Sequence, residues 1–176
     1  DTSLVGAGAN IVYPRVGQIV HYETELVAVI GKQAKGVSKR DALQYVLGYT
    51  CGNDVSERSI QRKEMAMGLM TVGKGFDTFA PIGPWIETEL DPTNLRMRGR
   101  LNGVVVQECE TSDLLFGVDA LVEYLSACIT LMPGDLIMTG TPGGVGPLKP
   151  GDRFDVEIDG IGILSNPVVA QEAARS

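Results

Sequence analysis

The order of hydrophobic and polar positions predicts a chain of many short strands and few helices. The clearest strand runs from His21 to Gly31, starting polar and continuing into an apolar run. Alternation over Leu95–Leu101, followed by Asn102-Gly103, is typical of a β-hairpin. Residues 1–20 are interpreted as a glycine-rich loop with short strands, and a Pro/Gly-rich connection is predicted over residues 78–84. Further strands are predicted at residues 49–54, 85–88, 104–108, 136–138, 154–158 and 161–168.

Three segments have the spacing of helices. Ser38 with Asp41 three residues later resembles a capping box and predicts a helix through Leu47 that ends at Gly48. Helices are also predicted from Ser56 to about Met67 and over Val118–Ile129. In the last of these, one face carries Leu121, Val122, Leu125 and Ile129. The fold class is therefore mostly β with a few helices (α+β), a twisted β-roll or sandwich formed by a single domain over residues 1–176.

Composition and charge narrow the classes of function. The 176 residues, with 44% hydrophobic and 21% charged, suit one soluble domain. A net charge of −7 argues against nucleic-acid binding, and the apolar runs are too short to span a membrane. Three cysteines without paired spacing indicate free thiols in a reducing compartment, so we expect a cytoplasmic protein. Because the chain starts at Asp1 and enters structure at once, we expect the natural protein to have residues upstream of it.

Three carboxylates are the candidate metal ligands. Side chains alternate along a strand, so Glu23 and Glu25 project from one face with Cα atoms about 7 Å apart. Two like charges at this separation are unfavourable without a cation between them, although spacing alone favours two solvated glutamates at a strand edge. Asp54 changes this balance, because it lies in an Asn-Asp turn between a predicted strand and a predicted helix. Three carboxylates with water and substrate oxygens complete an octahedron around Mg²⁺ or Mn²⁺.

Candidate anion-binding groups follow Asp54 in the sequence. Arg58 and Gln61 are three residues apart on the predicted helix and share a face. An arginine can bind a carboxylate with two parallel hydrogen bonds. Lys74 is flanked by glycines, which allow a ligand to approach the backbone closely. His21 shares the face of Glu23 and is a neighbour of the predicted site.

Two glycine-rich segments give weaker signals. Residues 139–146 follow a predicted buried strand, and either form a nest for a carboxylate or remain an unliganded loop. Residues 68–74 fit the first seven positions of a phosphate-binding loop. Gly75 then replaces the required Ser or Thr, and no buried strand precedes the segment, so we reject a phosphate-binding loop.

Several further segments stand in a recognisable order: His21-Tyr22-Glu23-Thr24-Glu25-Leu26, Gly48-Tyr49-Thr50, Asn53-Asp54-Val55-Ser56, Gly73-Lys74-Gly75-Phe76-Asp77-Thr78-Phe79, Pro81-Ile82-Gly83-Pro84-Trp85, Thr111-Ser112-Asp113, Leu131-Met132-Pro133-Gly134-Asp135 and Thr139-Gly140-Thr141-Pro142. Together these segments resemble the fumarylacetoacetate hydrolase family, in its short bacterial form. This resemblance implies a β-roll, a homodimer, and Mg²⁺ or Mn²⁺ as the cofactor, with Ca²⁺ in some members. Glu23, Glu25 and Asp54 match the metal ligands of the family. The family's substrate-contacting positions are matched in this chain by Arg58, Gln61, Lys74 and Thr141. Of these four residues, we expect Arg58 and Lys74 to be catalytic.

The family's reactions include hydrolysis of acylpyruvates, decarboxylation of oxaloacetate-like acids, and isomerisation or decarboxylation of hydroxymuconate-type catabolites. Its hydrolases and decarboxylases use a His–Glu pair in an upstream lid, and nothing in this chain matches that pair. Many members read Ser-Ala-Arg-Asp where this chain reads Ser56-Glu57-Arg58-Ser59.

The resemblance leads to a ranked set of functions. The leading hypothesis is isomerisation or decarboxylation of a 2-oxo or 2-hydroxydienoic dicarboxylic acid through a metal-stabilised enolate. The alternatives are a C–C hydrolase of acylpyruvates such as fumarylpyruvate, and a non-catalytic paralogue that binds a metal or a small acid. A generic β-sandwich binding module with an acidic surface is a weaker interpretation.

Overall fold

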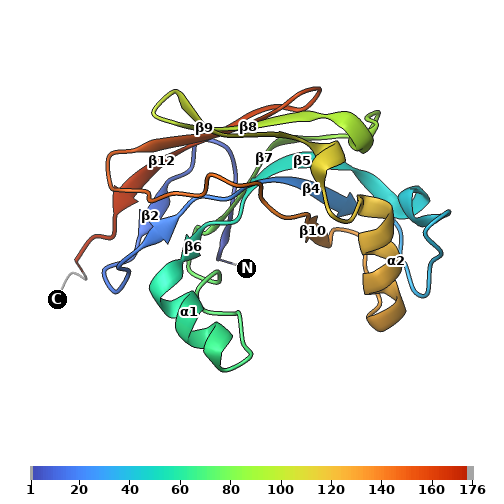
Figure 1. Ribbon diagram of the computed structural model, residues 1–176, viewed down its shortest axis with the longest axis horizontal. Coiled ribbons are helices and arrows are strands. Elements are labelled where there is room, and N and C mark those ends of the chain that lie inside the picture. The colour runs from blue at the N-terminus through green and yellow to red at the C-terminus, as the bar shows by residue number, and fades with distance from the viewer. Residues whose placement is uncertain (1, 174–176) are drawn as a thin grey trace.

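The structure is a computed structural model that describes residues 2–173, and the chain folds there into twelve strands and two α-helices. The predicted domain, residues 1–176, thus includes four residues outside the described part. Two five-stranded sheets and one two-stranded sheet make up the β structure, with parallel pairing only for β1–β7 and β2–β12 among the pairs described. The predicted α+β fold with mostly antiparallel strands is confirmed (Figure 1). In order across the sheets, the strands are β1 (Leu4–Val5), β7 (Ala80–Glu87), β5 (Val46–Asn53), β4 (Thr24–Ile30) and β10 (Leu136–Met138); then β2 (Ile11–Tyr13), β12 (Gly162–Ala170), β11 (Arg153–Ile158), β8 (Arg96–Leu101) and β9 (Val104–Glu110); then β3 (Val20–His21) and β6 (Ser56–Glu57).

The apolar core lies between the two large sheets. Leu26, Ala28 and Ile30 of β4 belong to the same buried cluster as Phe154 and Val156 of β11. Since side chains alternate along a strand, the opposite face of β4 carries Glu25, Val27 and Val29. The sheet therefore holds the acidic residues on the face of β4 that points away from the core.

The helices extend from one side of the strands in Figure 1. Helix α1 (Arg58–Ala66) starts at Glu57, whose carboxylate accepts a hydrogen bond from the Ile60 amide at 2.6 Å. Helix α2 (Val118–Cys128) buries Val118, Val122 and Ser126. The prediction that Ile129 belongs to its apolar face is wrong, because this residue caps the helix end and is exposed. In the described part of the chain, no helix has the length and apolar character needed to cross a membrane. Single 3-10 turns cover Ala42–Tyr45, Pro92–Asn94 and Thr111–Asp113.

The predicted helix over residues 38–47 is wrong. Only the 3-10 turn Ala42–Tyr45 is helical, and the Ser38 hydroxyl bonds the Asp41 carboxylate at 2.7 Å instead of capping a helix. Strand β5 starts at Val46, which pairs with Ile30 of β4. The long-range sheet pairing overrides the local helical pattern because it extends the central β4–β5 ladder.

The predicted connection over residues 78–84 is also wrong in part, because β7 starts at Ala80. Its prolines, Pro81 and Pro84, lack the amide hydrogen that a regular ladder needs. The β5–β7 pairing accommodates them with an irregular register, in which Tyr49 pairs with Glu87 but Cys51 pairs with Gly83. A proline-rich segment can thus serve as a strand between β5 and β1.

Candidate active site

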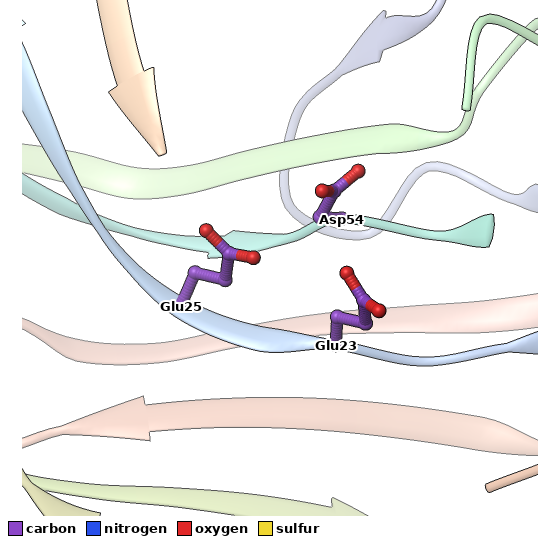
Figure 2. Close-up of side chains that lie close together, drawn as sticks. All are labelled: Glu23, Glu25 and Asp54. Carbon is purple, nitrogen blue, oxygen red and sulfur yellow. The ribbon is translucent and has the colours of Figure 1, made fainter. Parts of the chain in front are cut away.

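The carboxylates of Glu23, Glu25 and Asp54 converge on one point (Figure 2). One oxygen from each side chain lies within 4.8 Å of those of the other two. Glu23 is 8% exposed and Glu25 is 3% exposed, so the alternative of two solvated glutamates is contradicted. The predicted convergence of two separate stretches of chain is therefore present in the folded molecule.

Backbone contacts between the two acidic segments hold this arrangement. Thr24 of β4 pairs with Asn53 of β5, which brings the residues next to them together. The Glu23 amide donates to the Asn53 side-chain oxygen at 2.9 Å, and the Asp54 amide donates to the Glu23 carbonyl at 3.0 Å. These reciprocal bonds fix Glu23 and Asp54 relative to each other before any ligand binds.

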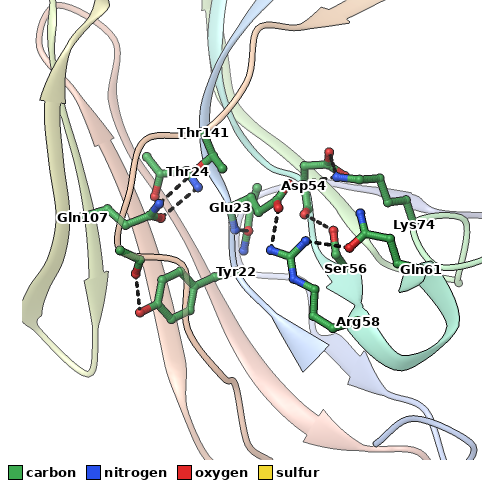
Figure 3. Close-up of polar contacts among 12 residues, drawn as sticks. Tyr22, Glu23, Thr24, Asp54, Ser56, Arg58, Gln61, Lys74, Gln107 and Thr141 are labelled. Atoms are coloured by element: carbon green, nitrogen blue, oxygen red, sulfur yellow. Dashed lines mark hydrogen bonds and ion pairs between the residues drawn. The ribbon is translucent and has the colours of Figure 1, made fainter. Parts of the chain in front are cut away.

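Two cations neutralise part of the negative charge. Arg58 contacts the Glu23 carboxylate at 2.5 Å and donates to the Gln61 side-chain oxygen at 2.8 Å. The Lys74 ammonium lies between Glu23, at 2.8 Å, and Asp54, with which it is ion-paired (Figure 3). The predicted cation set thus lies against the predicted metal ligands.

The charge balance of this cluster fits a divalent cation. Three carboxylates against Arg58 and Lys74 leave a formal charge of −1 if all are ionised. Glu25 has no ion pair within the described residues, and its carboxylate accepts one hydrogen bond, from the Gly140 amide at 2.8 Å. All-carboxylate oxygen donors are the ligands that Mg²⁺, Mn²⁺ and Ca²⁺ prefer. The residues present therefore suit such an ion.

The electrostatics of the cluster show in its pKa values. Burial raises the pKa of Glu25 to about 8, against the opposing effect of the Gly140 hydrogen bond. The nearby Asp54 and Glu23 carboxylates add to the rise. For Lys74, burial lowers the pKa, but the hydrogen bonds to Asp54 and Glu23 outweigh burial and raise it overall. Burial also raises the pKa of Asp54, against the hydrogen bond from Lys74, so two carboxyls of the triad favour a proton or a bound cation.

We expect the metal-free protein to lose stability as pH rises from about 4.5 to about 8, the ordinary and the folded pKa of Glu25. In that window the folded state holds a proton on Glu25 that the unfolded state has released, so raising the pH favours unfolding. The loss amounts to at most about 5 kcal/mol. Thermal melts in EDTA from pH 4 to 9 measure it. Glu25→Gln should lose less stability over this window than the unmodified protein, and equal pH slopes for both proteins would contradict the assignment.

The loop that carries Lys74 is held by Glu64 of α1. The buried Glu64 carboxylate accepts hydrogen bonds from the amides of Thr71 (3.2 Å), Val72 (2.7 Å) and Gly73 (2.8 Å). A Cβ on Gly73 would lie 2.9 Å from the backbone of Gln61. This glycine therefore permits the loop to pack on the helix, a different role from the ligand access inferred from the sequence.

Glu64→Gln is expected to lower turnover about tenfold or more, since it weakens charge-assisted hydrogen bonds that set the position of Lys74. Mn²⁺ affinity should change little, because the carboxylate triad is untouched. Steady-state kinetics and calorimetry with Mn²⁺ measure the two quantities. Arg62→Gln, at an exposed position on the same helix, is the control. Equal turnover in both variants would count against this role of Glu64.

The remaining predicted residues surround the triad. Thr141 lies in the loop after β10, and its hydroxyl accepts a hydrogen bond from Gln107 at 2.9 Å. This loop also borders a pocket of about 460 Å³ lined by Met97, Leu114 and Pro142 among others. Of the predicted glycine-rich nest, one amide, that of Gly140, binds a carboxylate of the site. His21 of β3 pairs with Ser56, two residues before Arg58, and burial together with the charges of Arg58 and Arg62 lowers the pKa of this histidine.

Sequence reasoning misses Asn53, Glu64 and Gln107 as supports of the site. In the sequence, Asn53 is recognisable only as part of a turn. Glu64 lies three residues after Gln61 on the predicted helix and therefore shares its face. Gln107 is a polar residue within an alternating strand, at a position that proves to be buried. An uncharged polar side chain at an inward-facing strand position is the one signal that could have drawn attention to it.

The fold is thus a curled β-roll that holds an acidic triad flanked by Arg58 and Lys74, a set of residues that suits a divalent ion. Residues 1–169 match the family model described as "Fumarylacetoacetate (FAA) hydrolase C-terminal". The chain belongs to this family. Family members similar to it are named as an isomerase, a hydrolase and a bifunctional isomerase/decarboxylase.

Two solved structures and one relative illustrate the similarity. The chain is 47% identical to a structure of 5-carboxymethyl-2-hydroxymuconate delta-isomerase from Mycobacterium smegmatis, with a TM-score of 0.94 over 98% of this chain and 67% of that one. It is 36% identical to fumarylpyruvate hydrolase from Pseudomonas aeruginosa in complex with Mn²⁺ and pyruvate, with a TM-score of 0.92 over 97% and 76% of the two chains. A Xenopus laevis protein named oxaloacetate tautomerase fahd2, mitochondrial, is 43% identical over 96% of this chain and 56% of its own length. The chain spans between 38% and 78% of the length of its curated relatives, 64% for the first of them.

Proposed function

We propose that this protein is a divalent-metal-dependent enzyme that isomerises or decarboxylates a 2-oxo or 2-hydroxydienoic dicarboxylic acid. The observation that carries the proposal is the buried triad of Glu23, Glu25 and Asp54 with Arg58 and Lys74 directly against it. Support also comes from the 47% identical isomerase, whose substrate by name is a hydroxymuconate.

Glu23, Glu25 and Asp54 would hold the ion, Mg²⁺ or Mn²⁺, with Ca²⁺ as a third candidate. Mn²⁺ in the Pseudomonas aeruginosa structure supports a divalent ion of this kind. When bound, the ion supplies Lewis-acid stabilisation of the negative charge that develops on the oxygens of a 2-oxo acid.

The chain's own residues bind and orient the acid. Arg58 and Lys74 offset the charge of the substrate carboxylate, which is why both are proposed as catalytic residues. Gln61 accepts the Arg58 hydrogen bond at 2.8 Å and so limits the orientations of the guanidinium. Thr141 presents a hydroxyl from the loop next to Glu25, since its neighbour Gly140 bonds that carboxylate.

Hydrolysis of a C–C bond in an acylpyruvate such as fumarylpyruvate is the second candidate, favoured by the similarity to fumarylpyruvate hydrolase. Hydrolysis needs a base that activates water. The chain has one histidine, His21, and both burial and the adjacent arginines lower its pKa. We therefore rank isomerisation or decarboxylation first, and a non-catalytic acid-binding paralogue last.

We also propose that the protein forms a homodimer through the outer face of the β1-β7-β5-β4-β10 sheet. An apolar hollow of about 480 Å³ on this face is lined by Leu4, Val29, Ile82, Ile86 and Leu136 among others. Leu4 and Ile86 are exposed there, and a second copy would cover them. Light scattering coupled to size-exclusion chromatography tests this, with Ile86→Glu as the variant expected to be monomeric.

The three free cysteines fit a reducing cytoplasm.

The test of function is turnover with Mn²⁺ or Mg²⁺ on a panel of acids. The panel contains 5-carboxymethyl-2-hydroxymuconate, oxaloacetate and fumarylpyruvate, followed by absorbance and by product analysis. Metal-dependent isomerisation or decarboxylation supports the proposal, and cleavage of fumarylpyruvate alone would favour the hydrolase. Binding of the acids without turnover would identify a non-catalytic paralogue.

A further inference from the structure

Gln107 joins the acidic strand to the loop that carries Thr141. It lies on β9, in the other sheet, and is 2% exposed. Its side-chain oxygen accepts from the Thr24 amide at 3.1 Å, and its nitrogen donates to the Thr141 hydroxyl at 2.9 Å and to the Pro142 carbonyl at 3.1 Å. Figure 3 shows Gln107 with Thr24 and Thr141 on the side of Glu23 opposite Arg58 and Lys74. One amide therefore ties together the peptide between the two glutamates and the hydroxyl-bearing loop.

The partners of Gln107 determine which way its amide points. The Thr24 amide can only donate a hydrogen bond, and the Pro142 carbonyl can only accept one. A flipped side chain would place donor against donor and acceptor against acceptor, so the nitrogen must face the loop. The Thr141 hydroxyl must then accept from Gln107.

This fixes what the Thr141 hydroxyl can offer to a ligand. A hydroxyl has one proton to donate and two lone pairs. One lone pair is used by Gln107, and between residues 2 and 173 the hydroxyl proton meets no protein acceptor. That proton is available to a ligand oxygen, at the end of the site where Gly140 bonds Glu25.

The packing around Gln107 is built for close approach. Gly99 of β8 pairs with Gln107, and a Cβ at Gly99 would overlap the Thr24 hydroxyl and lie 3.2 Å from the Gln107 oxygen. Only glycine at position 99 leaves enough space for the Gln107 side chain of β9 to reach Thr24 of β4 in the other sheet.

We propose that Gln107 is a positioning residue that makes Thr141 a hydrogen-bond donor to an oxygen of the acid substrate, at the end opposite Arg58 and Lys74. This inference rests on the proposed function and adds to it the residue that orients the Thr141 hydroxyl. Gln107 acts through Thr141, and it is not itself expected to touch the substrate.

Gln107→Glu tests the proposal because it changes one half of the contact. The introduced carboxylate keeps an acceptor for the Thr24 amide but has no donor, so the Thr141 hydroxyl turns to bond that carboxylate instead of the ligand. The Kd of pyruvate on the Mn²⁺-loaded protein, measured by calorimetry, and the KM of the best acid in the panel should each rise about tenfold or more. Mn²⁺ affinity should not fall, since the introduced carboxylate still accepts from the Thr24 amide and adds negative charge beside the acidic strand.

A double-mutant cycle with Thr141→Val separates positioning from a general structural effect. Thr141→Val should weaken pyruvate binding to a similar extent, and adding Gln107→Glu to it should change the Kd little further. Thr141→Ser, which keeps the hydroxyl, should bind pyruvate well and remain sensitive to Gln107→Glu. Gln44→Glu adds the same charge at an exposed position and is the control. If Gln107→Glu fails to fold, Gln107→Met removes the donor without adding charge and should show the same non-additivity with Thr141→Val.

Two results would overturn the role of Gln107. One is additivity of the Gln107 and Thr141 effects, and the other is a loss of Mn²⁺ affinity equal to the loss of pyruvate affinity. Either result with an active unmodified protein leaves the proposed function standing. An unmodified, Mn²⁺-loaded protein that neither binds pyruvate nor turns over any acid of the panel removes the proposed function, and the role of Gln107 with it.

Discussion

Glu23→Ala is expected to abolish metal binding and turnover together. Loss of a residue that only supports a metal ligand typically costs 10- to 100-fold in affinity, so loss of a proposed ligand should weaken Mn²⁺ binding by about 100-fold or more. Glu23 also contacts Arg58 at 2.5 Å and Lys74 at 2.8 Å, so its removal deletes the ion pair of Arg58 and one of the two ion pairs of Lys74. Calorimetry with Mn²⁺ and turnover of the best acid in the panel measure the two losses.

Matched variants make this result specific. Glu23→Gln keeps the shape and the backbone bonds to Asn53 and Asp54 but removes the charge, and it should lose metal in the same way. Glu89→Gln removes an exposed carboxylate outside the site and should leave both quantities unchanged. Turnover by Glu23→Ala in the presence of EDTA would show that the chemistry does not depend on this triad.

The residues of the acidic triad could be predicted because short stretches of sequence are enough to recognise them. Alternation alone places Glu23 and Glu25 on one face, and an Asn-Asp turn at a strand end is recognisable from residue type. What the sequence could not show is the register that brings Asn53 opposite Thr24, since strand pairing depends on the whole sheet. The convergence thus followed from two local patterns and one long-range pairing.

Long-range contacts also explain the errors. Residues 38–47 have the local signature of a helix start, but Val46 pairs with Ile30 in the sheet. This partner lies too far away in the sequence to affect a prediction from local pattern. The supports of the site escape notice for the same reason. Gln107 reaches Thr24 across 83 positions of sequence, and its importance is invisible until the two sheets are packed together.

The charges of the site differ between Glu25, which has no ion pair among the described residues, and Lys74, which has two. With all three carboxyls ionised, the triad carries more negative charge than Arg58 and Lys74 neutralise, and Glu25 is left with a backbone amide as its hydrogen-bond partner. Lys74, in contrast, is held by two carboxylates that the metal would also use. The lysine and the ion therefore compete for Glu23 and Asp54 while both attract the substrate anion.

Lys74→Met is expected to separate binding of the metal from catalysis. Removing a cation that stabilises developing negative charge typically costs 10²- to 10³-fold in kcat, and we expect a loss on the order of 100-fold or more. Mn²⁺ affinity should increase, because the Lys74 ammonium no longer neutralises Glu23 and Asp54. Kinetics at saturating Mn²⁺ and calorimetry measure the opposite changes.

The controls for Lys74→Met follow from the same electrostatics. Lys74→Arg keeps the charge and should retain more turnover than the methionine variant, without the gain in metal affinity. Lys63→Met removes an exposed lysine on α1 and should behave like the unmodified protein. If Lys74→Met instead loses Mn²⁺ as Glu23→Ala does, the lysine serves mainly to hold the triad together, and its proposed catalytic role is wrong. Opposite signs for metal affinity in the two variants would assign the carboxylates to the ion and the ammonium to the substrate.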